Sequence, residues 1–240
     1  MLVKRLRYAK YYAGVIFRNW RSKQESFAQH GEDLLIEQLL PKVESFIDIG
    51  ANDGVLFSNT YKFAKSGARG LCLEPSPSTF FKLRLNHLFH PKVKCVRAAV
   101  SNRPGSLPFI EDGYEAVLSR VTGTEHEESK EQSDLPATIE VPALTLGQIV
   151  SKYESFQETD LLSIDVEGHE RQILEGMNDT SLRARIIILE TDKSDIDSLM
   201  QLPALKRYRP TYSNGINSIF TIKNGNYKKP KVLPTNFLSL

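Results

Sequence analysis

The sequence predicts an α/β domain built on a mostly parallel sheet with helices on both faces. Short apolar runs alternate with helical patterns along the chain, and this alternation is typical of such sheets. Two of the apolar runs lead directly into acidic and turn-forming residues, as strands at a ligand edge do. The chain has 240 residues, 40% of them hydrophobic, which is enough for one substantial core. We therefore expect one main domain with short additions at its ends.

The five central strands are predicted from short runs rich in apolar and β-branched residues. Helical patterns fill the intervals between them, and Pro41 ends the helix that approaches the first strand. The predicted strands are residues 45–49, 70–73, 92–96, 161–164 and 185–189. The predicted helices are residues 26–40, 60–66 and 78–89, with a fourth that begins near Gly168.

The last part of the domain changes from the parallel pattern to a hairpin. Two strand-like runs, residues 208–213 and 218–222, are separated by Asn214 and Gly215, a pair that favours a tight turn. We therefore expect an antiparallel last strand to close the sheet.

Charge divides the chain into a central domain and two basic ends. Residues 1–24 hold seven Lys or Arg and no acid, whereas residues 111–140 hold nine Asp or Glu. Such runs are typical of solvated or interacting segments. The predicted divisions are a basic amphipathic helix over residues 1–25, a main domain over 26–225 that contains a mobile acidic loop at 111–140, and a basic C-terminal tail over 226–240.

The N-terminal segment has the periodicity of one helix face. Apolar residues recur at intervals of four and three from Leu2 to Trp20, and Lys and Arg surround them. Because the apolar stripe is narrow, we favour a helix that packs on the domain or on a partner. The alternative is a peripheral membrane contact through residues 1–24, since aromatic and basic side chains both favour an anionic interface.

The remaining composition indicates a cytoplasmic protein. No run approaches the roughly 18 apolar residues of a membrane span, and no cleavage site follows the apolar stretch at 11–17. Cys72 and Cys95 lie inside apolar strand-like runs, so we interpret them as reduced core thiols. A location at the inner membrane surface is the alternative if the N-terminal helix binds lipid.

A strand that leads into a glycine turn indicates a ligand site. The run FIDIGANDG, which ends at Gly54, is a buried strand followed by a tight turn, the place where open α/β sheets bind nucleotide-like ligands. Gly50 and Gly54 allow a positive φ, and Asn52 is the non-glycine residue that best tolerates one. Asp48 is expected at the carboxyl end of this strand.

The amino-acid sequence of this turn excludes two common types of nucleotide-binding site. The dinucleotide fingerprint needs glycine at positions 52 and 55, where the chain has Asn52 and Val55. A phosphate-binding loop needs Gly-Lys-Ser/Thr, which the turn lacks. The remaining pattern, in which an acid leads the turn, suits a cationic ligand without phosphates. S-adenosylmethionine is such a ligand.

The second strand also ends in an acid. Glu74 follows the run LCL and precedes Pro75, and a carboxylate there can accept hydrogen bonds from both hydroxyls of a ribose. Capping of the following helix is the alternative role, but Pro75 and Ser76 already offer helix-start chemistry. We therefore favour a binding role for Glu74.

Three titratable residues follow the fourth central strand. Asp165, Glu167 and His169 are expected at the ligand edge of the sheet, where such a group can supply a general base for an acceptor hydroxyl. His169 has the most suitable ordinary pKa of the three. A divalent cation held by Asp165 and Glu167 with Glu190 and Asp192 is a less favoured alternative. The structural alternative is that Glu167 only complements the helix dipole.

Several stretches resemble the FkbM-type methyltransferases. The turn FIDIGANDG and the later run LLSIDVEGHERQILEG are similar to two markers of that family, and the second is the more specific. Residues 26–33, the run LEPSP around Glu74, the run AAVSN at 98–102 and residues 217–220 are further similarities. Together they cover about residues 26–222 of the chain.

The resemblance implies a Rossmann-like class I methyltransferase fold with seven strands, S-adenosylmethionine as methyl donor, and transfer to oxygen. The implied acceptor is a sugar hydroxyl in a glycan or a glycosylated natural product. The resemblance also places Gln29 and Asp33 near the donor. The donor-binding residues that we expect are Gln29, Asp33, Asp48, Gly50, Ala51, Asn52, Gly54, Glu74, Pro75 and Ser101, and the expected catalytic residues are Asp165, Glu167 and His169.

A second interpretation is a catalytically silent Rossmann-like module that binds a membrane surface or a glycan-assembly partner through its basic ends. The presence of Asp48, Asn52 and Glu74 together argues against this interpretation, because a module without catalysis has no need for all three donor-site residues. The acidic segment in the middle of the chain argues against nucleic acid as a partner, because nucleic-acid sites need a basic surface. The oligomeric state stays open.

Overall fold

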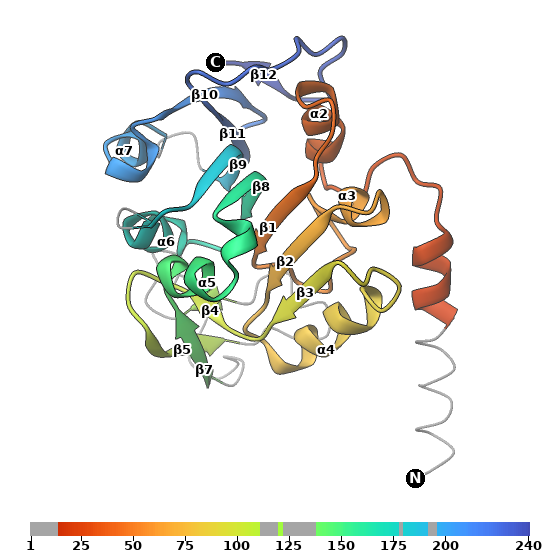
Figure 1. Cartoon of the computed structure of the whole chain (residues 1–240), viewed down its shortest axis with the longest axis vertical. Coiled ribbons are helices and arrows are strands. Elements are labelled where there is room, and N and C mark those ends of the chain that lie inside the picture. The colour runs from red at the N-terminus through yellow and green to blue at the C-terminus, as the bar shows by residue number, and fades with distance from the viewer. Residues whose placement is uncertain (1–13, 111–119, 122–137, 178–179, 192–195) are drawn as a thin grey trace, which may run out of the picture.

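The computed structural model describes residues 14–110, 120–121, 138–177, 180–191 and 196–240. In this part of the chain, an eight-stranded sheet forms the centre and a four-stranded sheet lies beside it (Figure 1). The α/β class predicted from the sequence is confirmed.

The parallel part of the large sheet contains the five predicted central strands. They are β1 (Ser45–Ile49), β2 (Arg69–Leu73), β3 (Val93–Val96), β8 (Glu158–Ile164) and β9 (Arg183–Glu190). β1 lies between β2 and β8 and pairs in parallel with both, and β3 and β9 extend this pairing outward. The carboxyl ends of all five strands therefore meet at one edge of the sheet.

Three further strands complete the large sheet. β10 (Tyr208–Ser213) and β11 (Asn217–Ile222) form the predicted hairpin, and β11 lies between β9 and β10, antiparallel to both. The antiparallel strand is thus confirmed, but it lies inside the sheet rather than at its edge. The edge strand is β12 (Leu238–Ser239), which pairs with β10. The strand order is β12-β10-β11-β9-β8-β1-β2-β3, one strand more than the seven expected.

The segment over residues 226–240, expected as a basic tail, packs on the domain. The backbone N–H of Lys228 donates to the carbonyl of Leu39, and the side chain of Phe237 is buried. Together with β12, these contacts make the segment part of the main domain.

The small sheet was not predicted. It consists of β4 (Ala99–Val100), β5 (Gly105–Ile110), β6 (Arg120–Val121) and β7 (Thr138–Leu144), in the order β4-β7-β5-β6. Because residues 120–121 and 138–140 lie in strands, the acidic loop predicted over 111–140 is wrong at these positions. The rest of that loop lies outside the described residues.

Helices cover both faces of the large sheet, as predicted. The helices on one face are α2 (Glu32–Leu39), α3 (Tyr61–Lys65) and α4 (Pro77–Asn86). The helices on the other face are α5 (Leu146–Lys152), α6 (Glu170–Met177) and α7 (Ile196–Met200), together with short 3₁₀ helices at Glu154–Phe156 and Pro203–Leu205. Strand side chains alternate between faces. Accordingly, Phe46 of β1 packs with α2 and α3, whereas Ile47 and Ile49 pack with α5 and α6.

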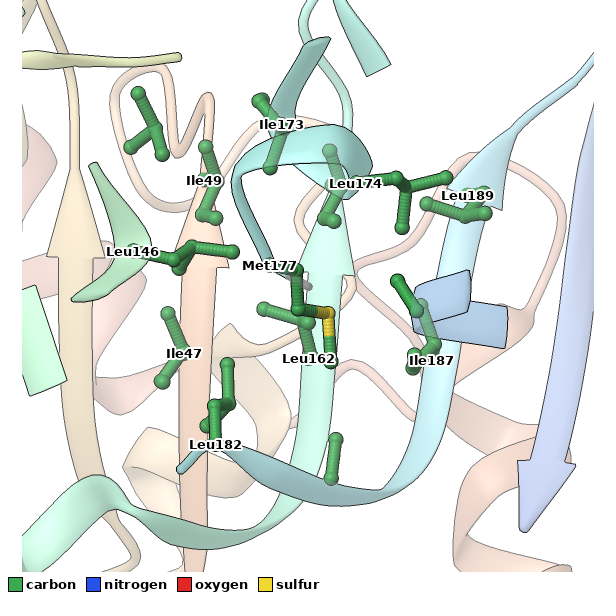
Figure 2. Packing of buried hydrophobic residues seen from close by; sticks show 14 of the residues in the cluster. Ile47, Ile49, Leu146, Leu162, Ile173, Leu174, Met177, Leu182, Ile187 and Leu189 are labelled. Atoms are coloured by element: carbon green, nitrogen blue, oxygen red, sulfur yellow. The ribbon is translucent and has the colours of Figure 1, made fainter. Parts of the chain in front are cut away.

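Helix α6 lies across the centre of the sheet (Figure 2). Its Ile173, Leu174 and Met177 are buried in one cluster with Leu162 of β8 and Leu189 of β9. Each such side chain contributes about 1.5–3 kcal/mol when it leaves water. This packing fixes the start of α6, and with it the turn that carries the second group of predicted site residues.

Two helices have boundaries that differ from the prediction. The helix expected over 26–40 begins only at Glu32, because Gly31 adopts a left-handed conformation with φ of 83° and breaks the pattern. Helix α4 begins at Pro77, where the Oγ of Ser76 accepts a hydrogen bond from the N–H of Thr79, and it ends three residues before the predicted position.

Residues 14–21 form a helix, as predicted for this part of the N-terminal segment, and residues 1–13 lie outside the described part. The ring centroid of Trp20 lies 5.0 Å from that of Phe89, and Lys65 Nζ donates to the carbonyls of Asn19 and Trp20. The helix therefore packs on the domain, as the favoured interpretation predicted. Among the described helices, none has the length and apolar character needed to cross a membrane.

Cys72 and Cys95 face each other across β2 and β3 as free thiols. Cys72 is buried and Cys95 is half-buried. Burial raises the pKa of both thiols, that of Cys95 to about 11. Cys72 lies in the core, as the sequence predicted, whereas Cys95 only packs against it.

Candidate active site

A pocket opens at the carboxyl edge of the parallel strands. The turn that begins at Gly50 after β1, Glu74 after β2, Asp165 after β8 and Glu190 at the end of β9 all line it. These residues are far apart in the sequence, and the parallel topology brings them to one place. This is the position where open α/β sheets bind ligands.

Glycine at position 50 is required by close packing at this edge. Gly50 has φ of 80°, and a Cβ atom there would lie 1.8 Å from the carbonyl oxygen of Asp165. Asn52 and Gly54 also have positive φ, of 49° and 78°. The left-handed conformations predicted for the turn are therefore present, and the turns after β1 and β8 touch through backbone.

Glu74 connects the turn after β1 to the start of α4. Its Oε2 accepts a hydrogen bond from the N–H of Asn52 at 3.1 Å, and its Oε1 accepts one from the N–H of Ser76 at 2.8 Å. The helix-start contact that was the alternative role is thus present, and the same carboxylate lines the pocket. Its contact with a ribose stays a prediction.

Asp48 is buried beneath the turn and also lines the pocket. Its Oδ2 accepts a hydrogen bond from Thr60 Oγ1 at 2.6 Å. Burial raises the pKa of Asp48 to about 7, and the charge of Asp165 adds to the rise, whereas the Thr60 hydroxyl opposes it. Near neutral pH the group is therefore divided between its charged and protonated forms.

The turn before α6 has an unusual backbone. Glu167 and Gly168 are both left-handed, with φ of 53° and 99°, and a non-glycine residue in this region costs on the order of 1–3 kcal/mol. Glu170 Oε1 accepts hydrogen bonds from the N–H groups of Val166 and Gly168 at 3.1 and 3.3 Å. Glu170 therefore holds the turn from within the helix, and Glu167 lines the pocket.

Three carboxylates form an acidic cluster in the pocket. One oxygen each from Asp165, Glu167 and Glu190 lies within 4.8 Å of the others. Burial, followed by the charges of Asp165, Glu167 and Glu170, raises the pKa of Glu190 to about 9, and burial raises that of Asp165 as well. Burial and mutual repulsion therefore favour a proton held between Glu190 and Asp165 over two full negative charges. Asp192, the fourth residue of the predicted cation site, lies outside the described residues.

His169 stands beside this cluster at the start of α6. Its side chain is buried, and its Nε2 lies 3.0 Å from Ser101 Oγ. Burial lowers the pKa of His169, although the charge of Glu175 opposes the shift. The imidazole is therefore neutral at pH 7 and has a nitrogen able to accept a proton.

Most of the other expected donor-site residues lie at the pocket. Gln29, Ala51 and Pro75 line it. Gly54 and Ser101 do not belong to the lining: Gly54 packs against the side chain of His87 under the turn, and Ser101 contacts His169.

Asp33 also lies away from the lining residues. Its buried carboxylate accepts hydrogen bonds from Ser26 Oγ and from the N–H groups of Phe27 and Leu34, at 2.6 to 2.8 Å. These contacts fold the approach segment that carries Gln29 to the pocket. Asp33, which the resemblance placed near the donor, is therefore connected to the pocket only through the segment that carries Gln29.

Several residues of the pocket were not predicted from the sequence. Asn59 donates from Nδ2 to Ser163 Oγ at 3.1 Å, and both residues line the pocket. Asn217 lies in a stretch that resembles the family, and this was the only signal for it. The apolar lining side chains that were missed include Phe109 and Val121 of the small sheet and Leu56, Phe57 and Ile216, of which the last three are exposed.

Residues 48–210 match the model of the family described as the Methyltransferase FkbM domain. A curated relative, Methyltransferase sdnD of Sordaria araneosa, is 26% identical over 192 residues, which cover 70% of this chain and 73% of that protein.

Two solved structures resemble the chain at a low level. Methyltransferase FkbM from Methylobacillus flagellatus has a TM-score of 0.46 and 12% identity, with 75% of this chain and 43% of that chain covered. A TehB-like SAM-dependent methyltransferase from Corynebacterium glutamicum has a TM-score of 0.42 and 12% identity, with 90% and 98% covered. The match therefore spans less than half of the first of these two chains. Since the family model covers well over half of the 240 residues, the chain belongs to the FkbM methyltransferase domain family.

Proposed function

We propose that this protein transfers the methyl group of S-adenosylmethionine to a hydroxyl group of a sugar, in a glycan or a glycosylated natural product. The observation that carries the proposal is a single pocket in which the glycine turn and Glu74 face Asp165 and His169. Methyl transfer needs a donor and an acceptor held in contact, and alignment of the two supplies much of the rate. Residues expected to bind the donor and residues expected to contact the acceptor line the same pocket.

The charge of the pocket supports a cationic donor. Five carboxylates line it, and none of its described lining residues is Lys or Arg; the acids are Asp48, Glu74, Asp165, Glu167 and Glu190. When bound, S-adenosylmethionine supplies an electrophilic methyl group on a positively charged sulfur. The same charge disfavours phosphate groups in the pocket. We therefore expect the acceptor to present an uncharged hydroxyl and to keep any phosphate outside.

The acceptor side of the pocket suits a hydroxyl that must lose its proton. We propose His169 as the general base, because its neutral imidazole can accept the proton as the acceptor oxygen bonds to the methyl carbon and the methyl–sulfur bond breaks, which releases S-adenosylhomocysteine. Asp165 and Glu190, which share a proton, can both donate and accept hydrogen bonds to sugar hydroxyls. These roles make the acidic cluster a positioning group rather than the base.

The test is methyl transfer from isotopically labelled donor to a panel of glycosides, with the position of the label determined by mass spectrometry. We expect an O-methyl product. His169→Gln should lower the transfer rate about 10²- to 10⁴-fold, the usual contribution of a general base, and leave donor affinity unchanged. His30→Gln is the matched control, because His30 is absent from the pocket lining. Transfer to nitrogen or carbon would contradict the proposal, and donor binding without any transfer would favour the silent module.

A divalent cation is a second candidate for the acidic cluster. Oxygen ligands are what Mg²⁺ and Ca²⁺ prefer, and the close approach of Asp165, Glu167 and Glu190 favours such a site. A cation there would polarise the acceptor oxygen and lower the pKa of its hydroxyl. The transfer assay separates the two candidates when it is repeated after chelator treatment and again with added Mg²⁺. Loss and recovery of activity would assign the cluster to a cation, and unchanged activity to hydroxyl binding.

A further inference from the structure

Two acid-free stretches of the chain come into contact on one side of the molecule, the first of them through residues that begin at position 14. Residues 1–24 contain seven Lys or Arg and no acid, and residues 75–110 contain six and no acid. The helix at residues 14–21 lies beside α3 and α4 (Figure 1). The contact between the rings of Trp20 and Phe89 joins the two stretches directly.

Large apolar side chains are exposed along this junction. The ring of Trp20 lies between those of Phe17 and Phe89, with centroids 5.7 and 5.0 Å away. Phe81 of α4 and Leu88 of the turn that follows it are 61% and 64% exposed. A patch of this kind on a protein surface marks an interaction site.

Basic side chains surround these apolar groups. The guanidinium carbon of Arg21 lies 5.3 Å from the centre of the Phe17 ring. The exposed basic residues of the two stretches on this side include Arg18, Arg21, Lys23, Arg84 and Lys92. We call the surface formed by these residues and the five exposed apolar side chains the basic aromatic face.

We propose that the basic aromatic face docks on an anionic lipid bilayer. Aromatic and leucine side chains enter the boundary between head groups and acyl chains, while Lys and Arg contact lipid phosphates. This combination matches both features of the surface, its charge and its exposed apolar groups. Nucleic acid matches the charge and the exposed rings, on which bases can stack, but it leaves the aliphatic Leu88 in water, whereas a bilayer takes up all five apolar side chains.

The position of this face ties it to the pocket. Pro75 lines the pocket, and α4 begins two residues later at Pro77. Phe81 follows in the next turn of the same helix. Docking therefore holds the donor side of the pocket close to the membrane surface. The proposal concerns location, and it stands or falls independently of the proposed reaction.

The test is co-sedimentation of the full chain with vesicles of phosphatidylcholine, with and without added phosphatidylglycerol. We expect binding to the anionic vesicles that weakens as salt is raised. The double variant Phe81→Ser/Leu88→Ser removes apolar groups, and Arg18→Glu/Arg21→Glu reverses two charges. Each should lower the vesicle partition coefficient about tenfold or more, given the contribution of each basic contact and of each buried apolar group.

Matched controls lie on the C-terminal segment that packs against α2. Val232→Ser removes an apolar side chain that is 72% exposed, and Lys228→Glu/Lys229→Glu reverses two exposed charges. Both controls should bind vesicles as the wild type does. Thermal unfolding of each variant checks that the fold is kept, which the exposure of the substituted side chains favours.

Three results would overturn the proposal. The first is absence of sedimentation with anionic vesicles, and the second is an equal loss of binding in the controls. The third is tighter binding to RNA than to vesicles in an anisotropy titration, with no effect of Phe81→Ser/Leu88→Ser. That third result would assign the face to nucleic acid.

Discussion

Substitution of Gly50 by alanine probes the contact between the two turns that form the pocket. The added Cβ atom would lie 1.8 Å from the carbonyl oxygen of Asp165, whereas real Cβ atoms essentially never approach closer than about 3 Å. One of the two turns must therefore move by about 1 Å. A displacement of this size in a catalytic site costs on the order of 10²-fold in rate.

Gly67→Ala separates this clash from backbone strain. Gly67 has φ of 86°, close to the 80° of Gly50, but a Cβ atom there meets nothing within 4 Å. Alanine in the left-handed region costs about 1–2 kcal/mol at either position. Only the Gly50 variant adds a clash with the pocket. Because the backbone strain is the same in both variants, the clash alone should account for the further loss of stability, ligand affinity and methyl transfer in Gly50→Ala.

The assay combines calorimetric titration of S-adenosylhomocysteine with urea unfolding of both variants. Gly67→Ala should lose about 1–2 kcal/mol of unfolding free energy and bind ligand as the wild type does. Gly50→Ala should lose more stability and bind at least tenfold more weakly. Equal ligand affinity in the two variants would refute the account of the turn.

Three further predictions follow from single side chains. Glu74→Gln should weaken donor binding about tenfold or more, because a hydrogen bond to a charged group contributes about 1.5–3 kcal/mol; unchanged affinity by calorimetry would remove Glu74 from the site. His87 has its pKa lowered to about 3 by burial, with His90 adding to the effect. Its stabilising contribution is therefore complete above its unfolded pKa near 6.5 and decreases as pH falls, by about 1.4 kcal/mol between pH 7.5 and 5.5. Asp48 and Glu190, whose raised pKa values give the opposite dependence on pH, are common to the wild type and a His87→Gln variant, so urea titrations of both proteins at the two pH values isolate the His87 contribution; an equal pH dependence of the unfolding free energy in the two proteins would contradict it. Leu174→Ala, in the fully buried contact of α6, should cost about 2–5 kcal/mol of unfolding free energy, and a loss below about 1 kcal/mol would show that α6 does not anchor the turn.

The central strands were predictable from sequence because their signal is local. Most side chains of the four inner strands β1, β2, β8 and β9 are buried on both faces, so their apolar pattern is nearly continuous, whereas the edge strand β3 is only partly buried. The small sheet gives no such signal. Pro108 and Pro142 interrupt β5 and β7, and the paired strands are 27 residues apart in the chain. Their pairing is decided by tertiary contacts that no short window contains.

The site was predictable to the extent that topology alone places its residues. Parallel strands share a carboxyl edge, so Asp48, Glu74 and Asp165 were expected together and line one pocket. Asn59 and Phe109 were not predicted, because the periodicity of the strands does not show that the segments carrying these two residues fold against the pocket. For Asp33, the resemblance indicated a location near the donor, but its three hydrogen bonds depend on the broken helix start at Gly31.

The most direct test of the central claim is calorimetric titration of S-adenosylmethionine and S-adenosylhomocysteine into the full-length protein, with and without a chelator. We expect stoichiometric binding of both ligands at one site, and a loss of affinity in Glu74→Gln. Absence of binding to protein shown to be folded would contradict the assignment of the pocket as a methyl-donor site.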